Sequence, residues 1–246
     1  FQRPKVPAFA ADLDPGIVQL HSSDYRDLAR LQPGPVLVVG AGNSAGEIAP
    51  ELARAGAAVT VSVRTGAVAV PRALAGVPIQ YFAVVASLLP AHAQQIVLRA
   101  TARLGELRRG RSPLPSPPDA AGVCPDVPLI GFHLVDAIRQ GLVRLAPALE
   151  AFTPSGARFA DGSEAPFEAV ILATGYRPAL GPLGRLIALD RCGFASRDRR
   201  VTSRDERGLF FVGQTYDRRG ALFNMGRDAA TLARLIARDR RGGRYI

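Results

Sequence analysis

A run of small residues at positions 40–45 has the composition and spacing of a phosphate-binding turn. It reads Gly40-Ala41-Gly42-Asn43-Ser44-Ala45, which is the pattern G-x-G-x-x-A. In that pattern the first glycine allows a tight turn, the second lets the backbone approach a pyrophosphate, and the last small residue lets a helix pack closely on a strand. N–H groups at the start of the helix would bind the phosphates. The run predicts a dinucleotide site, with a ligand-free strand-to-helix connection as the alternative, and the residues predicted to bind are Gly40, Gly42, Asn43, Ser44 and Ala45.

An arginine after the next predicted strand bears on which dinucleotide binds. In this class of site an acidic residue at the end of the second strand accepts hydrogen bonds from the ribose hydroxyls of NAD or FAD. Here Val63 is followed by Arg64. A guanidinium can bind the oxygens of a 2′-phosphate with two hydrogen bonds. It has no acceptor for the hydrogen of a plain 2′-hydroxyl. The sequence therefore favours NADPH over NADH, and the alternative is an exposed arginine without a ligand.

The hydrophobic pattern places this turn inside a strand–helix–strand unit. Residues 36–39 are a short apolar run, typical of a strand buried on both faces of a parallel sheet. Apolar residues then recur at helical spacing from Ala45 to Ala53, with Asn43 or Ser44 expected as the N-cap. The next strand is predicted from three alternating valines, Val59, Val61 and Val63. A strand, a glycine turn, a helix and a strand predict an α/β fold with a Rossmann-like βαβ domain.

The rest of the chain continues with short apolar segments and turns. Residues 1–34 are Pro-rich and are expected to form an irregular surface connection. The later pattern predicts a helix at 131–140, a strand at 142–145, a hairpin around 158–159, buried strands at 169–172 and 209–213, and a last helix from about Arg227.

An apolar segment at 73–97 contains no Asp, Glu, Lys or Arg. Pro78 and Pro90 interrupt it, and about 20 mainly apolar residues would be needed to span a membrane. We predict a buried helix or a cap over an apolar pocket. Peripheral contact with a membrane is the alternative.

Composition narrows the classes of protein and partner. With 246 residues, 48% of them hydrophobic, the chain is long and apolar enough to build a core. The net charge is +10, but the arginines are dispersed and are not interleaved with aromatic residues, so no nucleic-acid partner is predicted. Cys124 and Cys192 are expected to be free thiols, which indicates the cytoplasm. His92 and His133 have no partners at ligand spacing, so no metal site is predicted.

Several motifs together resemble the flavin-containing monooxygenases and their Baeyer–Villiger relatives. Residues 15–25 resemble the signature F-x-G-x-x-x-H-x-x-x-[FY], with Asp14 in place of the first Phe and one extra residue before His21. The run at 40–47 resembles the second glycine motif of that family, and residues 62–64 resemble the strand end that follows it. Residues 173–176 are similar to its A-T-G-Y hinge, and residues 211–213 to the last strand of its FAD domain. His21 and Tyr25 are interpreted as structural.

The resemblance implies a division of the chain into three regions. Residues 1–34 would be a connecting segment, and residues 35–130 the NADPH-binding Rossmann-like domain with an apolar helical insert. Residues 131–246 would be the remainder of the NADPH domain together with the C-terminal part of a FAD-binding α/β domain.

The resemblance also implies cofactors, residues and a reaction. It places Thr174 and Gly175 at the hinge between the two domains and Gly213 and Gln214 next to FAD. NADPH would reduce the flavin, and O2 would then oxygenate a soft nucleophile or a ketone on a small hydrophobic substrate through a peroxyflavin. No catalytic side chain is identified.

The family's earlier glycine motif, which holds the ADP part of FAD, is not found in these 246 residues. We therefore expect a truncated form, with the FAD cradle supplied by a longer precursor or by a partner chain. The alternative is a flavin-free NADP(H)-binding module or subunit without catalytic activity. A third hypothesis is a FAD-dependent reductase, and the absence of a Cys-x-x-Cys pair argues against its disulfide-reducing version.

Overall fold

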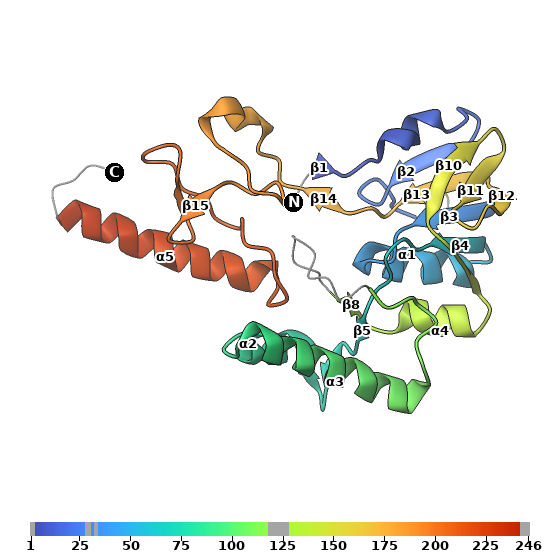
Figure 1. The fold of residues 1–246 in the computed structure, drawn as a ribbon, viewed down its shortest axis with the longest axis horizontal. Helices are drawn as coiled ribbons and strands as arrows, with labels where there is room; N and C mark the ends of the chain where they lie inside the picture. The colour runs from blue at the N-terminus through green and yellow to red at the C-terminus, as the bar shows by residue number, and fades with distance from the viewer. Residues whose placement is uncertain (1–2, 28–30, 32–33, 118–127, 242–246) are drawn as a thin grey trace.

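A parallel β-sheet forms the core of the part of the molecule that lies on the right in Figure 1. The computed structural model describes residues 3–27, 31, 34–117 and 128–241. The sheet has five strands, each parallel to its neighbours, in the order β2 (Val18–His21), β13 (Ala169–Leu172), β3 (Pro35–Val39), β4 (Ala58–Ser62) and β9 (Val143–Ala146). The predicted α/β class with a Rossmann-like βαβ unit is confirmed.

The central strand β3 is buried because both faces of the sheet are covered. Successive side chains of a strand point to opposite faces. Val36 and Val38 lie in the core under α1 (Asn43–Arg54) and α4 (His133–Arg139), whereas Leu37 and Val39 lie in a second core. That second core is closed by the short helix η1 (Ala8–Asp12) and an antiparallel sheet of β10 (Leu149–Thr153), β11 (Gly156–Phe159) and β12 (Glu164–Pro166). A strand covered on both faces reads as a continuous apolar run, as at residues 36–39.

The N-terminal region is more ordered than the sequence suggests. Residues 1–34 are predicted to be an irregular connection, and this is wrong for Val18–His21, which forms the edge strand β2 beside β13. A short strand β1 (Arg3–Pro4) also pairs with β14 (Tyr176–Arg177). An edge strand has one strand neighbour, so polar residues such as Gln19 are tolerated in it and the apolar run that marks buried strands is absent.

The apolar segment at 73–97 does not form a buried helix. It folds as a small hairpin of β6 (Ala73–Leu74) and β7 (Val77–Pro78), the helix α2 (Ile79–Ala86), and the first turns of α3 (Ala91–Arg109). No residue of α2 is buried, and Tyr81 and Val85 are each 66% exposed. The prediction of a buried helix is therefore wrong. Within the described residues, no helix combines the length and apolarity needed to cross a membrane.

The C-terminal part of the chain differs from expectation at two elements. The predicted strand at 209–213 is wrong: within the described structure this run makes an isolated bridge between Phe210 and Thr202, while Phe211 is buried beside Ile187 and Ala195. The last helix, α5 (Ala221–Arg241), begins well before the predicted start near Arg227. A short apolar run alone does not distinguish a strand from a buried loop, because it carries no period.

The remaining short elements complete the chain. A parallel bridge joins β5 (Ala69–Val70) to β8 (Leu129–Ile130), η3 (Gly181–Leu186) follows β14, and β15 (Arg197–Asp198) pairs with β16 (Thr202–Ser203) as a hairpin.

Cys192 is disulfide-bonded, so the expectation of a free thiol there is wrong. Cys124 lies outside the residues that the structure describes. The prediction of a cytoplasmic location loses the support of the cysteines and stays a prediction.

Candidate dinucleotide-binding site

The parallel sheet brings several of the predicted site residues to one edge. Gly40 follows β3, Arg64 comes shortly after β4, and Thr174 and Gly175 follow β13, which lies next to β3. The Gly40 N–H donates to the carbonyl oxygen of Ser62 at 2.9 Å, which joins the turn to the end of β4. The glycine turn, the strand end with its arginine, and the hinge therefore lie together at the carboxyl edge, where open α/β sheets bind their ligands.

Two glycines of the turn have different physical tasks. Gly40 has a φ of +117°, and a Cβ there would lie 2.5 Å from the carbonyl oxygen of Ala173, so no larger residue fits. A Cβ on Gly42 would meet no described atom within 4 Å. Gly40 is thus required by the fold, whereas Gly42 keeps space open in front of the helix.

The start of α1 is suited to bind an anion. Its N-cap is Gly42, not Asn43 or Ser44 as predicted, and no side chain caps it. The Gly46 N–H is the first of this turn to bond back, to the Gly42 carbonyl at 2.9 Å. Because the first N–H groups of a helix have no intrahelical acceptor, those of residues 43–45 are oriented to bind phosphate oxygens. The chain therefore fits the pyrophosphate of a dinucleotide at this point.

The side chain of Asn43 is used for folding. Its Oδ1 accepts from the Ile130 N–H at 2.8 Å, and its Nδ2 donates to the Pro128 carbonyl at 3.3 Å. These two bonds hold the start of α1 against β8. They explain why the Asn43 side chain does not cap its own helix.

Arg64 is exposed beside this turn. Among the described residues it has no ion-pair partner. The neighbouring strand end is fixed, since the Ser62 hydroxyl donates to the Pro147 carbonyl at 2.7 Å. The exposed guanidinium therefore comes shortly after a fixed strand end, next to the glycine turn.

His21 is a structural residue at the hinge. It is 5% exposed, and its Nε2 donates to the Gly175 carbonyl at 3.0 Å because a carbonyl can only accept. Its Nδ1 accepts from the Ser23 N–H at 3.1 Å, and its ring stands edge-on to Tyr176. With both ring nitrogens occupied, His21 fixes the backbone at Gly175, where φ is +85°.

Tyr25 is also engaged in structure. Its hydroxyl donates to Glu51 Oε1 at 3.0 Å and so ties the N-terminal region to α1. Burial, followed by the hydrogen bond and the negative charge of Glu51, raises the pKa of Tyr25 to about 12. A phenol held neutral in this way is a hydrogen-bond donor and not a general base at neutral pH.

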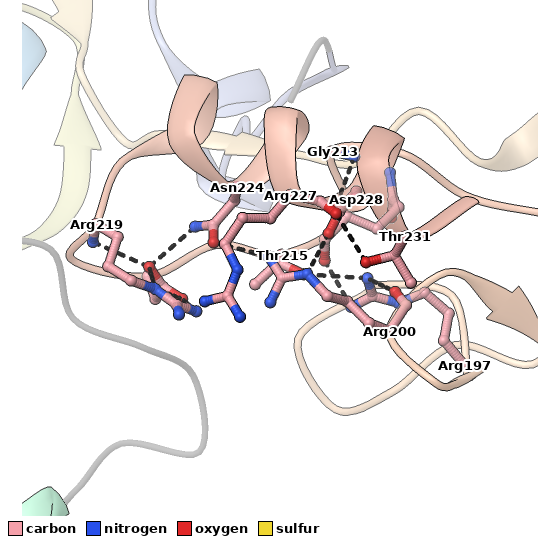
Figure 2. A network of polar contacts seen from close by, with 11 residues as sticks. Arg197, Arg200, Gly213, Thr215, Arg219, Asn224, Arg227, Asp228 and Thr231 are labelled. Atoms are coloured by element: carbon pink, nitrogen blue, oxygen red, sulfur yellow. Dashed lines mark hydrogen bonds and ion pairs between the residues drawn. The ribbon is translucent and has the colours of Figure 1, made fainter. Parts of the chain in front are cut away.

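Gly213 and Gln214 contact a second cluster of polar residues, formed by α5 and the β15–β16 hairpin. Figure 2 shows Gly213 and Arg197 in this cluster. The Gly213 N–H donates to Asp228 Oδ2 at 2.9 Å, and Arg197 Nη2 donates to the Gln214 carbonyl at 2.7 Å. The Gln214 side-chain oxygen Oε1 is buried and has no hydrogen-bond partner among the described residues. An acceptor left unpaired inside a folded protein is costly unless a ligand supplies the donor, so this position fits a bound group that carries N–H or O–H donors.

The sequence analysis missed the residues that hold this second cluster. Asn224 and Asp228 of α5 are completely buried, and Asp228 forms an ion pair with Arg200. Asn224 Nδ2 in turn donates to Asp217 Oδ1 at 2.9 Å. The sequence does contain a signal for this cluster. Asn224 and Asp228 are four residues apart and so share one side of the helix, and the segment before the helix is rich in arginine.

Two groups of the cluster have shifted pKa values. Burial tends to raise the pKa of Asp217, but hydrogen bonds from Arg219 and Asn224 outweigh it, and the pKa lies below its usual value. Burial lowers the pKa of Arg197, with the charges of Asp228 and Asp190 opposing that shift. Within the described part of the chain, no group of three or more His, Cys, Asp or Glu side chains is arranged to hold a metal ion.

Comparison with known proteins identifies the class. The family model described as "Flavin-binding monooxygenase-like" matches residues 15–185, so the chain belongs to that family of flavoprotein oxidoreductases. Among curated relatives, an indole-3-pyruvate monooxygenase YUCCA8 of Oryza sativa subsp. indica is 36% identical over 165 residues, covering 64% of this chain and 39% of the relative. An uncharacterized CzcO-like oxidoreductase of Geobacillus kaustophilus is 31% identical over 235 residues, covering 94% of this chain and 61% of the relative.

Solved structures agree on the fold. A flavin-containing monooxygenase from Stenotrophomonas maltophilia superposes with a TM-score of 0.63 at 19% identity. The match covers 96% of this chain and 59% of the monooxygenase chain. OTEMO in complex with FAD and NADP gives a TM-score of 0.62 at 14% identity. That match covers 98% of this chain and 60% of the OTEMO chain. At these identities the likeness shows the fold alone. The chain spans between 39% and 61% of the length of these relatives.

Proposed function

We propose that this chain binds NADPH at the carboxyl edge of its sheet and acts within a flavin-dependent monooxygenase. The observation that carries the proposal is the uncapped start of α1 behind the open space at Gly42, with Arg64 at the adjacent strand end. The complete enzyme would use O2 to oxygenate a soft nucleophile or a ketone on a small hydrophobic organic substrate. Family membership supports this reaction class.

The geometry at each position supports the proposed contact. The N–H groups of residues 43–45 would bind the pyrophosphate, and Arg64 would bind the 2′-phosphate bidentately. Thr174 and Gly175 would shape the backbone at the hinge, where the Thr174 hydroxyl already donates to the Lys5 carbonyl. Gln214 Oε1, at Gly213, would accept a hydrogen bond from FAD. The two cofactors would supply hydride transfer and oxygen activation, and the protein's part is binding, orientation and exclusion of water.

Further polypeptide is needed to complete a FAD site. We propose that residues 35–130 serve NADPH binding and that 131–246 add the rest of that domain and part of the FAD side, with the remaining FAD contacts supplied by a longer form of the chain or by a partner chain. Exposed apolar side chains on two separate helices support this. Tyr81 and Val85 of α2 and Leu222 of α5 are exposed, as expected for surfaces that another part of the enzyme covers.

The apolar side chains of α2 also bear on the substrate. Phe82 and nearby Leu88 are exposed and apolar, which supports a role in admitting a hydrophobic substrate to a pocket. Peripheral contact with a membrane is the alternative use of this surface. Polar substitutions at Phe82 and Leu88 should raise KM for the substrate, and unchanged kinetics would exclude the role in substrate access.

The first experiment is a visible absorption spectrum with intact mass on protein purified from its natural source, followed by titration with NADPH. Flavin absorbance together with NADPH binding would support the monooxygenase. A colourless protein that binds NADPH would instead support the alternative, a flavin-free NADP(H)-binding module. Failure to bind NADPH in either case would overturn the proposal for the glycine turn.

A further inference from the structure

A hollow on the C-terminal part of the molecule is lined mainly by arginine. The hollow is open to solvent, has a volume of about 350 Å³, and lies between the turn that joins β15 to β16 and the second half of α5. Its lining side chains are Arg199, Thr231, Arg234, Leu235 and Arg238. None of these described lining residues is acidic. Three cations therefore share one concave surface.

One face of α5 builds both this hollow and the neighbouring ion pair. Asn224, Asp228, Thr231, Leu235 and Arg238 follow one another at spacings of three or four residues, so they lie along one side of the helix. The first two are completely buried beneath the β15–β16 hairpin. The hollow is the continuation of a packed contact and not an isolated stretch of surface.

The hairpin turn holds Arg199 at this place in an unusual backbone conformation. Arg199 and Arg200 have φ values of +44° and +77°, a region that residues other than glycine rarely adopt. Arg200 is fixed there by its ion pair with Asp228 and by a bond from its Nη2 to Asn224 Oδ1 at 2.8 Å, and its carbonyl accepts from Arg197 Nη1 at 2.9 Å (Figure 2). Strained residues that are held by their surroundings cluster at functional sites.

The chemistry of the lining selects an oxyanion. Like charges placed together repel, and a bound anion removes that repulsion. Guanidinium groups match the oxygens of a phosphate in a planar, two-point geometry. The Thr231 hydroxyl donates to the Arg227 carbonyl at 2.8 Å, so the arginines are the donors that remain. Three arginines suit a ligand with more than one negative charge.

We propose that Arg199, Arg234 and Arg238 form a binding site for clustered phosphate groups, separate from the dinucleotide turn. In Figure 1 the second half of α5 lies on the opposite side of the molecule from the sheet. The site goes beyond the proposed function and does not depend on it. Free polyphosphate and the headgroups of an anionic lipid surface carry the same chemistry.

Calorimetric titration of the full chain with inorganic triphosphate tests the site. The double variant Arg234→Gln/Arg238→Gln should weaken binding at least tenfold. The control Arg144→Gln/Arg185→Gln, which removes the same charge at two exposed positions outside the hollow, should change it less than twofold. The variant Arg64→Ala is titrated in the same way, to identify heat that comes from triphosphate binding at the dinucleotide turn.

A second arm distinguishes the sources of phosphate. Sedimentation with phosphatidylglycerol vesicles, compared with phosphatidylcholine vesicles, measures binding of the protein to an anionic lipid surface. Loss of triphosphate binding in the Arg234→Gln/Arg238→Gln protein supports a soluble ligand, and loss of vesicle binding alone supports a lipid headgroup. Binding of neither probe, or equal losses in the double variant and its charge-matched control, overturns the proposal.

Discussion

Arg64 is the residue on which cofactor preference depends. Replacing it with alanine should weaken NADPH binding by about 1–3 kcal/mol, roughly 5- to 150-fold, because a charge-assisted bond to the 2′-phosphate is lost. NADH has no such phosphate, so its affinity should hardly change. Fluorescence titration of both nucleotides measures the difference, with Arg144→Ala as a control arginine on β9. Equal losses for NADPH and NADH would remove Arg64 from the 2′-phosphate site.

Tyr25 gives a pH-dependent prediction. Its pKa is raised to about 12, so the neutral phenol is favoured in the folded state. Its contribution to stability is therefore complete below pH 10, the ordinary tyrosine value, and is lost as pH rises through about 12. Absorbance titration near 295 nm should show a late tyrosine that disappears in Tyr25→Phe. Ionisation of Tyr25 at the ordinary tyrosine value near pH 10 would contradict the bond to Glu51.

At the scale of elements, the turn before α1 separates folding from binding. Gly40→Ala should lower the free energy of unfolding by about 1–3 kcal/mol or more, because φ is +117° and the new Cβ would overlap the Ala173 carbonyl. Gly42→Ala has an ordinary φ of −80° and no described atom within 4 Å, so its stability should be retained while NADPH affinity falls. Urea unfolding and NADPH titration of both variants test this. Equal destabilisation of the two would show that Gly42 serves the fold.

The buried ion pair joins the β15–β16 hairpin to α5. Asp228→Ala leaves Arg200 without its partner and the Gly213 N–H without its acceptor, and breaking a buried pair costs about 3–5 kcal/mol. The exposed pair Arg204–Asp198 should contribute about 0–1 kcal/mol, so Asp198→Ala is the control. Thermal unfolding compares them. Similar melting temperatures for the two variants would contradict a structural role for Asp228.

Prediction from the sequence succeeded where one periodicity dominates. Strands β3, β4 and β13 and the helix α1 were predicted because a buried strand reads as an apolar run and a half-buried helix has a period of 3.6 residues. The glycine turn followed from its place between them. The edge strand β2 was missed, since one covered face and two polar residues leave no run.

Other features depend on contacts between distant segments and could not be predicted. Asn43 is a good N-cap by residue type, but its side chain bonds β8, which lies far away in the sequence. The apolar residues of α2 predict burial, but the described elements leave all of them exposed or half-buried. The pairing of Arg200 with Asp228 could not be predicted either, because nothing in the sequence distinguishes Arg200 from the other arginines near it.

At the scale of the whole molecule, the apolar cores are unevenly distributed. The sheet lies between two extensive clusters of buried apolar residues, whereas the C-terminal part has a small cluster around Ile187, Ala195 and Phe211 and relies on the polar network of α5. Regions with little buried apolar area open more readily. The two parts are therefore expected to differ in stability although they belong to one chain.

Amide hydrogen exchange should show this difference and locate NADPH. We expect the slowest exchange in β3 and β13, where strands are paired on both sides, and faster exchange in residues 187–212. NADPH should slow exchange at residues 40–46, whose N–H groups would bind the pyrophosphate, without slowing it in α5. Protection by NADPH in α5 instead would place the nucleotide at the arginine-lined hollow. That result would contradict the site at the sheet edge and the separation of the two sites together.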